Sequence, residues 1–274
     1  EFASQTLGTL DTYHRLEKQR GHIYNWYNIE TLQPIAPLIV SAVDSGNLAA
    51  SLYTLHAGAL DLLKRPLLSE TAFTVVEDML EDQPKRHHRK AARHAAAMPI
   101  RSHIQRLFKA SPSTQDEPAQ QSGWPAQEAA RRRDALARFV EQYTPWLLPR
   151  FAPLFEYFGG DSTKEGAEAD LKNKEGEVPT LQTAVQYAGV LERRIADTPV
   201  AHAEASSLSP LAAELGPLLS AAKANLARLE ADIASIAARA GQYAEEMDFS
   251  FLLVESRQLL SIAYDGTTGE LHPS

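Results

Sequence analysis

Residues 21–55 read GHIYNWYNIETLQPIAPLIVSAVDSGNLAASLYTL, and more of the fold can be inferred from this stretch than from any other. Its first part alternates aromatic rings with asparagines, at Tyr24, Asn25, Trp26, Tyr27 and Asn28. This alternation favours a short extended segment, which can line a cleft. Pro34 and Pro37 follow, and they exclude regular helix and central strand because proline lacks a backbone N–H and restricts the residue before it. The sequence therefore predicts an aromatic segment that ends in a stiff turn.

A helix is predicted after this turn. Ser41 and Asp44 have the spacing of a capping box, with aspartate in place of the usual glutamate. Apolar residues then recur every three or four positions, at Leu48, Leu52, Leu55, Ala59, Leu62 and Leu63. The string Asp44, Ser45, Gly46, Asn47 suits a first turn poorly, since glycine alone costs about 1 kcal/mol against alanine inside a helix. Either Asp44 is only a cap, or it belongs to a binding site that Gly46 allows a ligand to approach.

Near the other end of the chain, residues 247–274 read MDFSFLLVESRQLLSIAYDGTTGELHPS. The first stretch resembles GHxYNWYDTxTLxPLxPxxVSTVDSGNLA, a segment of bacterial cyclic β-1,2-glucan synthases in the region tied to their glycoside-hydrolase-like cyclisation domain. The second resembles MDFxFLxxxxRxLxxIGYxxxxGxLDPS of the same family, in the same order, while the helical region between them matches only in general character. The chain departs from these patterns at Asn28, Ala42, Ala263 and His272. Asn28 and His272 each replace a carboxylate, so no binding role is carried over to them.

This resemblance implies a mainly α fold in which antiparallel helix pairs form part of an (α/α)6 toroid, here incomplete, with a short β-hairpin near the C-terminus. It also implies a transglycosylase activity that closes linear β-1,2-glucan into rings, within a membrane-attached synthase on the cytoplasmic side of the bacterial inner membrane. The family's catalytic glutamates lie in segments that follow the second stretch, so no catalytic residue is assigned here. What remains is a wall of the glucan-binding cleft, beside other domains of the synthase.

The residues predicted to bind glucan are Tyr24, Asn25, Trp26, Tyr27, Asp44, Ser45 and Asn47. A carboxylate accepts hydrogen bonds from sugar hydroxyls, amide and hydroxyl side chains orient them, and aromatic rings stack on a pyranose face. Two alternatives stay open. In the first, the parent protein is an endo-β-1,2-glucanase. In the second, the chain is a non-catalytic helical scaffold that docks neighbouring domains.

The composition is that of a globular protein: 274 residues, 44% of them hydrophobic and 23% charged, suffice for one large domain or two small ones. The absence of cysteine excludes disulfides and thiolate metal sites, and a net charge of -8 disfavours attraction to nucleic acid or anionic lipid. No metal or nucleotide motif, signal peptide or apolar run near the roughly 20 residues that span a bilayer is present. We therefore expect a soluble piece of a longer protein, with no cofactor, no metal, no nucleic-acid partner and no direct membrane insertion.

The remaining chain is predicted to be mostly helical, within a single domain over 1–274. Helices are expected over 6–20, with Gly21 as the C-terminal stop, over 69–81, over 125–158 with breaks at Pro145 and Pro149, and over 180–196. A longer helix is expected to start at Ser209 and Pro210, with a jog at Gly216-Pro217, and to run continuously over 217–247. The exceptions are a basic helix and flexible loop over 84–124, a surface loop over 159–179 and the β-hairpin over 249–271. The basic segment is either a surface for nucleic acid or an acidic partner, or a solvated helix facing an acidic neighbour. Because no aromatic residues interleave with the charges, the second interpretation is favoured.

Overall fold

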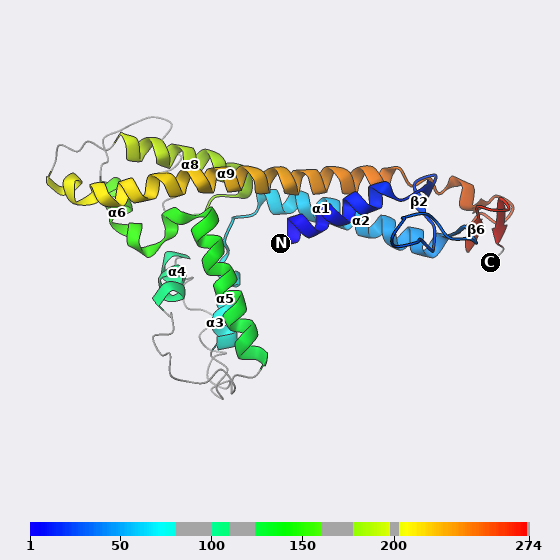
Figure 1. Cartoon of the computed structure of the whole chain (residues 1–274), viewed down its shortest axis with the longest axis horizontal. Coiled ribbons are helices and arrows are strands. Elements are labelled where there is room, and N and C mark those ends of the chain that lie inside the picture. Colours follow the sequence, from blue (N-terminus) through cyan, green and yellow to red (C-terminus); the bar gives the residue numbers. More distant parts are fainter. Residues whose placement is uncertain (81–99, 110–123, 161–177, 198–202, 273–274) are drawn as a thin grey trace. The chain divides into compact units, whose positions relative to one another are not determined.

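The computed structural model describes residues 1–80, 100–109, 124–160, 178–197 and 203–272 (Figure 1). These residues form eight α-helices, seven short strands and three 3-10 helices. The chain divides into two compact units, one made of Glu1–Lys64 with Arg228–Ser274 and the other of Arg65–Ala227. The predicted fold class is confirmed, since the chain is mainly α with a small antiparallel sheet near its C-terminus.

The first unit contains α1 (Phe2–Arg15), α2 (Ala42–Lys64) and the last part of α9 (Ala203–Glu245). An ion pair of 2.7 Å between Asp11 and Arg239 joins α1 to α9. Most apolar positions of α9 in this unit recur every three or four residues and are buried, whereas Leu229 is partly exposed; the buried ones are Ile233, Ile236, Ala240, Tyr243 and, just past the helix, Met247. These residues form the core of the unit.

Helix α1 differs at both ends from the helix predicted over 6–20. It begins four residues earlier and ends at Arg15. The Nζ of Lys18 donates to the carbonyl oxygens of His14 and Leu16, at 3.2 and 3.0 Å, and so satisfies backbone acceptors near the helix end. The helix therefore stops before the predicted boundary.

A tight hairpin follows α1, where the helix was expected to continue. Strand β1 (Lys18–Gln19) pairs antiparallel with β2 (His22–Ile23). Gly21 lies in the turn with a φ of +84°, and a Cβ at this position would be 2.1 Å from the carbonyl oxygen of Glu246. The prediction that Gly21 ends a helix is wrong, because glycine is required here by the left-handed turn and by the close approach of another backbone segment.

The aromatic segment leads into a loop that is closed by a bridge between Tyr27 and Pro34. At the tip of this loop, the carboxamide oxygen of Asn28 accepts hydrogen bonds from the backbone N–H groups of Glu30 and Thr31, both at 2.9 Å. This is the side-chain turn that asparagine favours. Asn28 therefore has a structural role.

Helix α2 follows directly from strand β3 (Ile39–Ser41). The hydroxyl oxygen of Ser41 accepts the backbone N–H of Asp44 at 3.2 Å, so the capping contact predicted for Ser41 is confirmed. Gly46 lies in the second turn, and a Cβ there would have no other atom within 4 Å. Packing within the described residues therefore does not require a glycine at position 46.

The second quoted stretch forms two hairpins where one was predicted over 249–271. A 3-10 helix, η4 (Ser250–Leu252), precedes β4 (Leu253–Val254), which pairs with β5 (Leu259–Leu260). Strand β6 (Ala263–Asp265) then pairs with β7 (Glu270–His272).

Local side-chain contacts explain the difference. The carboxylate of Asp248 accepts the N–H of Ser250 at 2.8 Å and starts a 3-10 turn where a strand was expected. The carboxylate of Asp265 accepts the N–H of Thr267 at 2.8 Å, and Gly269 has a φ of +76°. These two features produce a second turn that strand alternation does not indicate.

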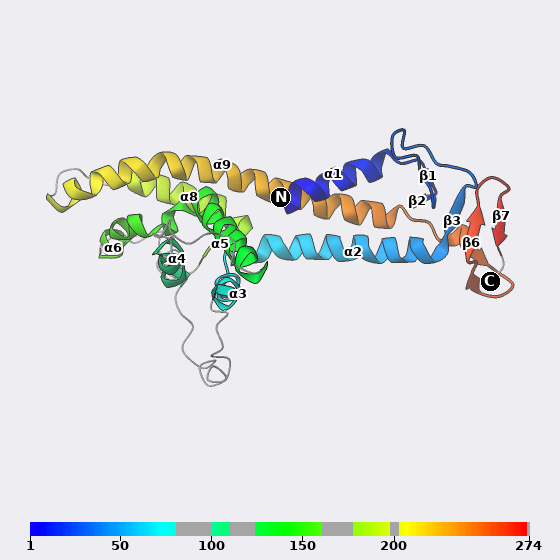
Figure 2. The same cartoon turned by 60° about the horizontal axis from the view of Figure 1, so that its bottom comes forward.

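The two quoted stretches meet in one three-stranded sheet of order β3-β6-β7 (Figure 2). Val40 of β3 lies opposite Tyr264 of β6, and the N–H of Gly266 donates to the carbonyl oxygen of Leu38 at 2.7 Å. Segments more than two hundred residues apart in sequence are therefore joined within the first unit.

The helices of the second unit are α3 (Glu70–Leu80), α4 (Ile100–Lys109), α5 (Trp124–Tyr143), α6 (Ala152–Gly160), α8 (Leu181–Ala196) and the first part of α9. The predicted breaks after α5 are confirmed, since Pro145 and Pro149 open the 3-10 helices η2 (Pro145–Leu147) and η3 (Pro149–Phe151). Trp146 and Phe151 are buried, so these aromatic residues belong to the core. Most of 84–124 and 159–179 lies outside the described residues.

Helix α9 begins six residues before the predicted start at Ser209, and it contains both Pro210 and Pro217. Each proline removes one backbone hydrogen bond. Leu215 and Leu219, on either side of Pro217, are fully buried, and the burial of two leucines contributes about 3 to 6 kcal/mol. This burial offsets the cost of the proline, so the helix continues through it.

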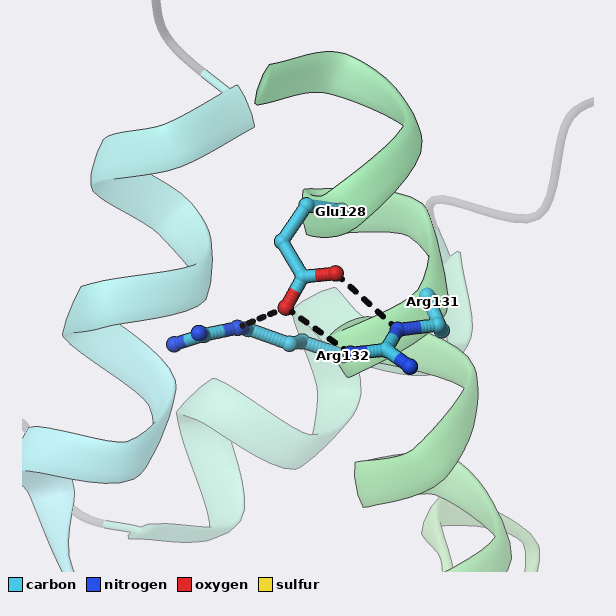
Figure 3. Close-up of polar contacts among 3 residues, drawn as sticks. All are labelled: Glu128, Arg131 and Arg132. Atoms are coloured by element: carbon cyan, nitrogen blue, oxygen red, sulfur yellow. Dashed lines mark hydrogen bonds and ion pairs between the residues drawn. The ribbon is translucent and has the colours of Figure 1, made fainter. Parts of the chain in front are cut away.

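The arginine-rich part of α5 is held by an acidic residue of the same helix. Glu128 accepts hydrogen bonds from Arg131 at 2.9 Å and from Arg132 at 2.7 Å (Figure 3). These contacts, that of Arg131 first, lower the pKa of the Glu128 carboxyl. The spacings of three and four residues are those of ordinary helix ion pairs, which indicates a solvated helix face.

Candidate functional site

A cavity of about 270 Å³ lies in the first unit, between the aromatic segment and the first turn of α2. Its lining residues are Ile23, Tyr24, Asn25, Trp26, Asp44 and Ser45. Five of the seven residues predicted to bind glucan are therefore brought together, and Tyr27 and Asn47 are not among the lining residues.

Backbone hydrogen bonds fix the aromatic side of the cavity. The N–H of Asn25 donates to the carbonyl oxygen of Ile39 at 2.9 Å, which ties this side to β3. The carbonyl oxygen of Trp26 accepts the N–H of Ile35, also at 2.9 Å. The backbone of Asn25 and of Trp26 is therefore constrained, while their side chains remain available to contact a ligand.

Tyr27 supports the aromatic segment through its hydroxyl group. This oxygen accepts the N–H of Tyr24 at 2.9 Å and donates to the carbonyl oxygen of Glu17 at 2.7 Å. Burial raises the pKa of the Tyr27 phenol. Its hydroxyl is therefore engaged with backbone, and a role for its ring in binding stays a prediction.

The polar groups of the cavity are not satisfied by the protein. Within the described part of the chain, no hydrogen bond or ion pair engages the carboxylate of Asp44, the hydroxyl of Ser45 or the side chain of Asn25. Ser45 is only 3% exposed, whereas the indole of Trp26 is 52% exposed. Asp44 and Asn25 are exposed and the Ser45 hydroxyl still reaches solvent, so all three polar groups are accessible to a ligand.

His22 was not singled out from the sequence, although it lies directly before the cavity-lining residues. Its imidazole is completely buried, with Nε2 2.9 Å from the carbonyl oxygen of Asp248, and Nδ1 has no partner among the described residues. The ring is packed edge-on against Phe249 and Phe251, at centroid distances of 4.7 and 5.3 Å. Burial lowers the pKa of His22, because an apolar site disfavours the charged imidazolium.

The buried His22 predicts a loss of stability in mild acid. The folded chain keeps this imidazole neutral, while the unfolded chain binds a proton below about pH 6.5. Falling pH through this window therefore favours unfolding, by at most about 1.4 kcal/mol per pH unit. Urea titrations of wild type and His22→Gln between pH 7.5 and 5 measure how stability depends on pH. In wild type we expect a slope that corresponds to the uptake of about one proton on unfolding. A slope that is the same in both proteins would exclude His22 as its source.

Two further searches concern only the described residues. No group of three or more histidine, aspartate or glutamate side chains there is arranged to hold a metal ion. None of the described helices combines the length and the apolar character that crossing a membrane requires.

Comparison with known proteins adds one relation. No family model matches the chain. Over 62 residues, or 23% of the chain, it is 42% identical to the cyclic β-(1,2)-glucan synthase NdvB of Rhizobium meliloti strain 1021. The chain is related to this synthase over that segment. The matched segment is 2% of the synthase, so the chain spans only a small part of it.

Proposed function

We propose that the chain forms a wall of a glucan-binding cleft in a cyclic β-1,2-glucan synthase or a closely related carbohydrate-active enzyme. The observation that carries this proposal is the cavity in which three polar side chains without protein partners lie beside the half-exposed indole of Trp26. The relation to a glucan synthase supports β-1,2-glucan as the ligand.

The chemistry of the lining residues suits a neutral sugar. The Asp44 carboxylate accepts hydrogen bonds from sugar hydroxyls, which are the stronger, charge-assisted kind. Asn25 and Ser45 each offer a donor and an acceptor, and they orient the ring. The indole of Trp26 covers the apolar face of the pyranose. A ligand with many hydroxyl groups satisfies these side chains together.

We assign cleavage of the glycosidic bond to residues outside this chain. Glycoside chemistry uses two carboxyl groups on either side of the scissile bond, whereas Asp44 is the one carboxylate among the residues that line this cavity. In our proposal the chain binds glucan, and carboxylates of the longer synthase carry out the transglycosylation.

We further propose that the chain belongs to one larger helical domain, of the (α/α)6 toroid type, in a synthase held at the cytoplasmic side of the inner membrane. Helix α2 supports this, because its solvent-facing side carries Val43, Leu60 and Leu62, all exposed in the first unit. Large apolar side chains left exposed on one helix can be covered by neighbouring helices. Other domains or helices of the synthase are the expected partners.

Replacement of Trp26 by alanine tests the binding function. We expect wild type to bind a linear β-1,2-gluco-oligosaccharide in calorimetric titration, and Trp26→Ala to bind it about tenfold or more weakly, because a half-exposed tryptophan supplies most of the apolar contact. Trp124→Ala is the matched control, since Trp124 is 72% exposed on α5 and lies in the second unit. Equal losses in both variants, or no binding by wild type, would refute the proposal.

A further inference from the structure

We infer that Gly266, in the turn after β6, is a positioning residue for the glucan site, because the absence of a side chain there leaves room for the ring of Tyr24. This inference rests on the proposed function, since it concerns the same site and the same ligand. It adds a residue of the second quoted stretch to the site, although none of the described residues of that stretch lines the cavity.

Gly266 lies at a crowded position. A Cβ there would be 3.2 Å from the carbonyl oxygen of Leu38, 3.3 Å from Cε1 of Tyr24 and 3.4 Å from the Cβ of Leu38. Among the described glycines, a positive φ is found at Gly21 and Gly269, so the backbone conformation at Gly266 does not itself demand glycine. A side chain at position 266 would therefore act on its two neighbours, Leu38 and Tyr24.

The backbone of Leu38 is fixed on both sides. Its carbonyl oxygen accepts the N–H of Gly266 at 2.7 Å, and its N–H donates to the hydroxyl oxygen of Thr267 at 3.4 Å. The next residue, Ile39, pairs with Asp265 in the ladder between β3 and β6. The carbonyl group of Leu38 cannot give way without straining these hydrogen bonds.

The ring of Tyr24 is the neighbour that can move. Rotation about its side-chain torsions leaves the hydrogen bond between the Tyr24 N–H and the Tyr27 hydroxyl intact. Tyr24 is only 6% exposed, and it lines the cavity, so the free volume beside it is the cavity itself. Because protein interiors are close-packed, a displaced ring moves into such a space. A side chain at position 266 is therefore expected to shift Tyr24 towards the volume that the sugar occupies.

The two quoted stretches then act on one site. Residues 23–26 and 44–45 line the cavity, and the turn after β6 limits where the ring of Tyr24 can lie. A misplacement of about 1 Å costs a preorganised site roughly a hundredfold, so a smaller shift should cost several-fold in affinity.

Calorimetric titration with a linear β-1,2-gluco-oligosaccharide tests the inference. We expect Gly266→Ala to bind this probe about threefold to tenfold more weakly than wild type. Gly241→Ala is the matched control and should bind like wild type. A Cβ at position 241 would lie 2.8 Å from Nδ1 of His56 and so crowds the first unit too, but neither residue lines the cavity.

The outcomes separate the inference from the proposed function. Wild-type affinity in Gly266→Ala, or an equal loss in Gly241→Ala, would overturn the inference and leave the proposed function standing. Absence of binding by wild type would overturn both.

A double-mutant cycle with Tyr24→Leu distinguishes positioning from general destabilisation. Leucine lacks the ring atom that approaches position 266, so Gly266→Ala should cost the Tyr24→Leu protein less than about twofold in affinity. Thermal unfolding of the four proteins gives the same comparison without ligand, and Gly266→Ala should lower the melting temperature less when Tyr24 is leucine. Equal losses in the two backgrounds would show that Tyr24 is not the residue displaced, and would overturn the inference.

Discussion

Replacing Gly21 with alanine is expected to destabilise the first unit by about 3 to 5 kcal/mol. The alanine Cβ would lie 2.1 Å from the carbonyl oxygen of Glu246 and 2.9 Å from the Cα of Met247. Both are backbone atoms, so no side-chain rotation relieves the clash. The φ of +84° adds a conformational cost of about 1 to 2 kcal/mol for any residue with a Cβ. Urea unfolding followed by circular dichroism measures the change.

Gly8→Ala is the matched control for this substitution. Gly8 lies in α1, is exposed, and a Cβ there would meet no atom within 4 Å. This change should stabilise the chain by about 0.5 to 1 kcal/mol, since alanine favours helix over glycine. If Gly21→Ala were as stable as Gly8→Ala, the close approach of the 20–22 turn to Glu246 would be absent in solution.

Asp44→Asn is expected to weaken binding of a linear β-1,2-gluco-oligosaccharide by about tenfold to a hundredfold, or roughly 1.5 to 3 kcal/mol. The exposed carboxylate has no protein partner within the described residues, and an amide accepts hydroxyl hydrogen bonds less strongly. Stability should change by less than about 1 kcal/mol. The N–H of residue 44 still donates to Ser41, and only a charge near a helix N-terminus is lost.

Glu255→Gln removes the same charge at an exposed turn between β4 and β5 and serves as the control. Calorimetric titration gives the affinity and thermal unfolding gives the stability of each variant. Unchanged affinity together with a lower melting temperature in Asp44→Asn would reduce Asp44 to a helix cap.

The helical parts of the fold were largely predictable because their signals are local. Ser41 at the start of α2 and the prolines after α5 gave correct boundaries, since capping and the missing proline N–H act within one turn. The end of α1 was predicted wrongly. It depends on Lys18, whose side chain returns to the carbonyl oxygens of the last turn.

Long-range contacts could not be derived from the periodicity. Gly21 has the pattern of a helix stop, but its conformation is explained by Glu246, which lies at the far end of the chain. The continuation of α9 through Pro217 likewise depends on the burial of Leu215 and Leu219.

Much of the candidate site was visible in the sequence because its residues lie in two short strings, 24–26 and 44–45. Sequence periodicity is less able to distinguish an aromatic ring that lines a cavity from one that supports the wall of the cavity. Tyr27 follows Trp26 directly, yet its hydroxyl is bound to the backbone of Glu17 and Tyr24. His22 gave no signal, since its burial depends on Phe249 and Phe251, more than two hundred residues away.

A crystal structure of the chain with a linear β-1,2-gluco-oligosaccharide tests the central claim most directly. We expect one glucosyl ring in the cavity, stacked on the indole of Trp26, with hydroxyl groups within hydrogen-bond distance of the Asp44 carboxylate and the Ser45 hydroxyl. Sugar bound only outside this cavity, or an empty cavity at saturating sugar, would contradict the claim that residues 24–26 and 44–45 form a glucan site.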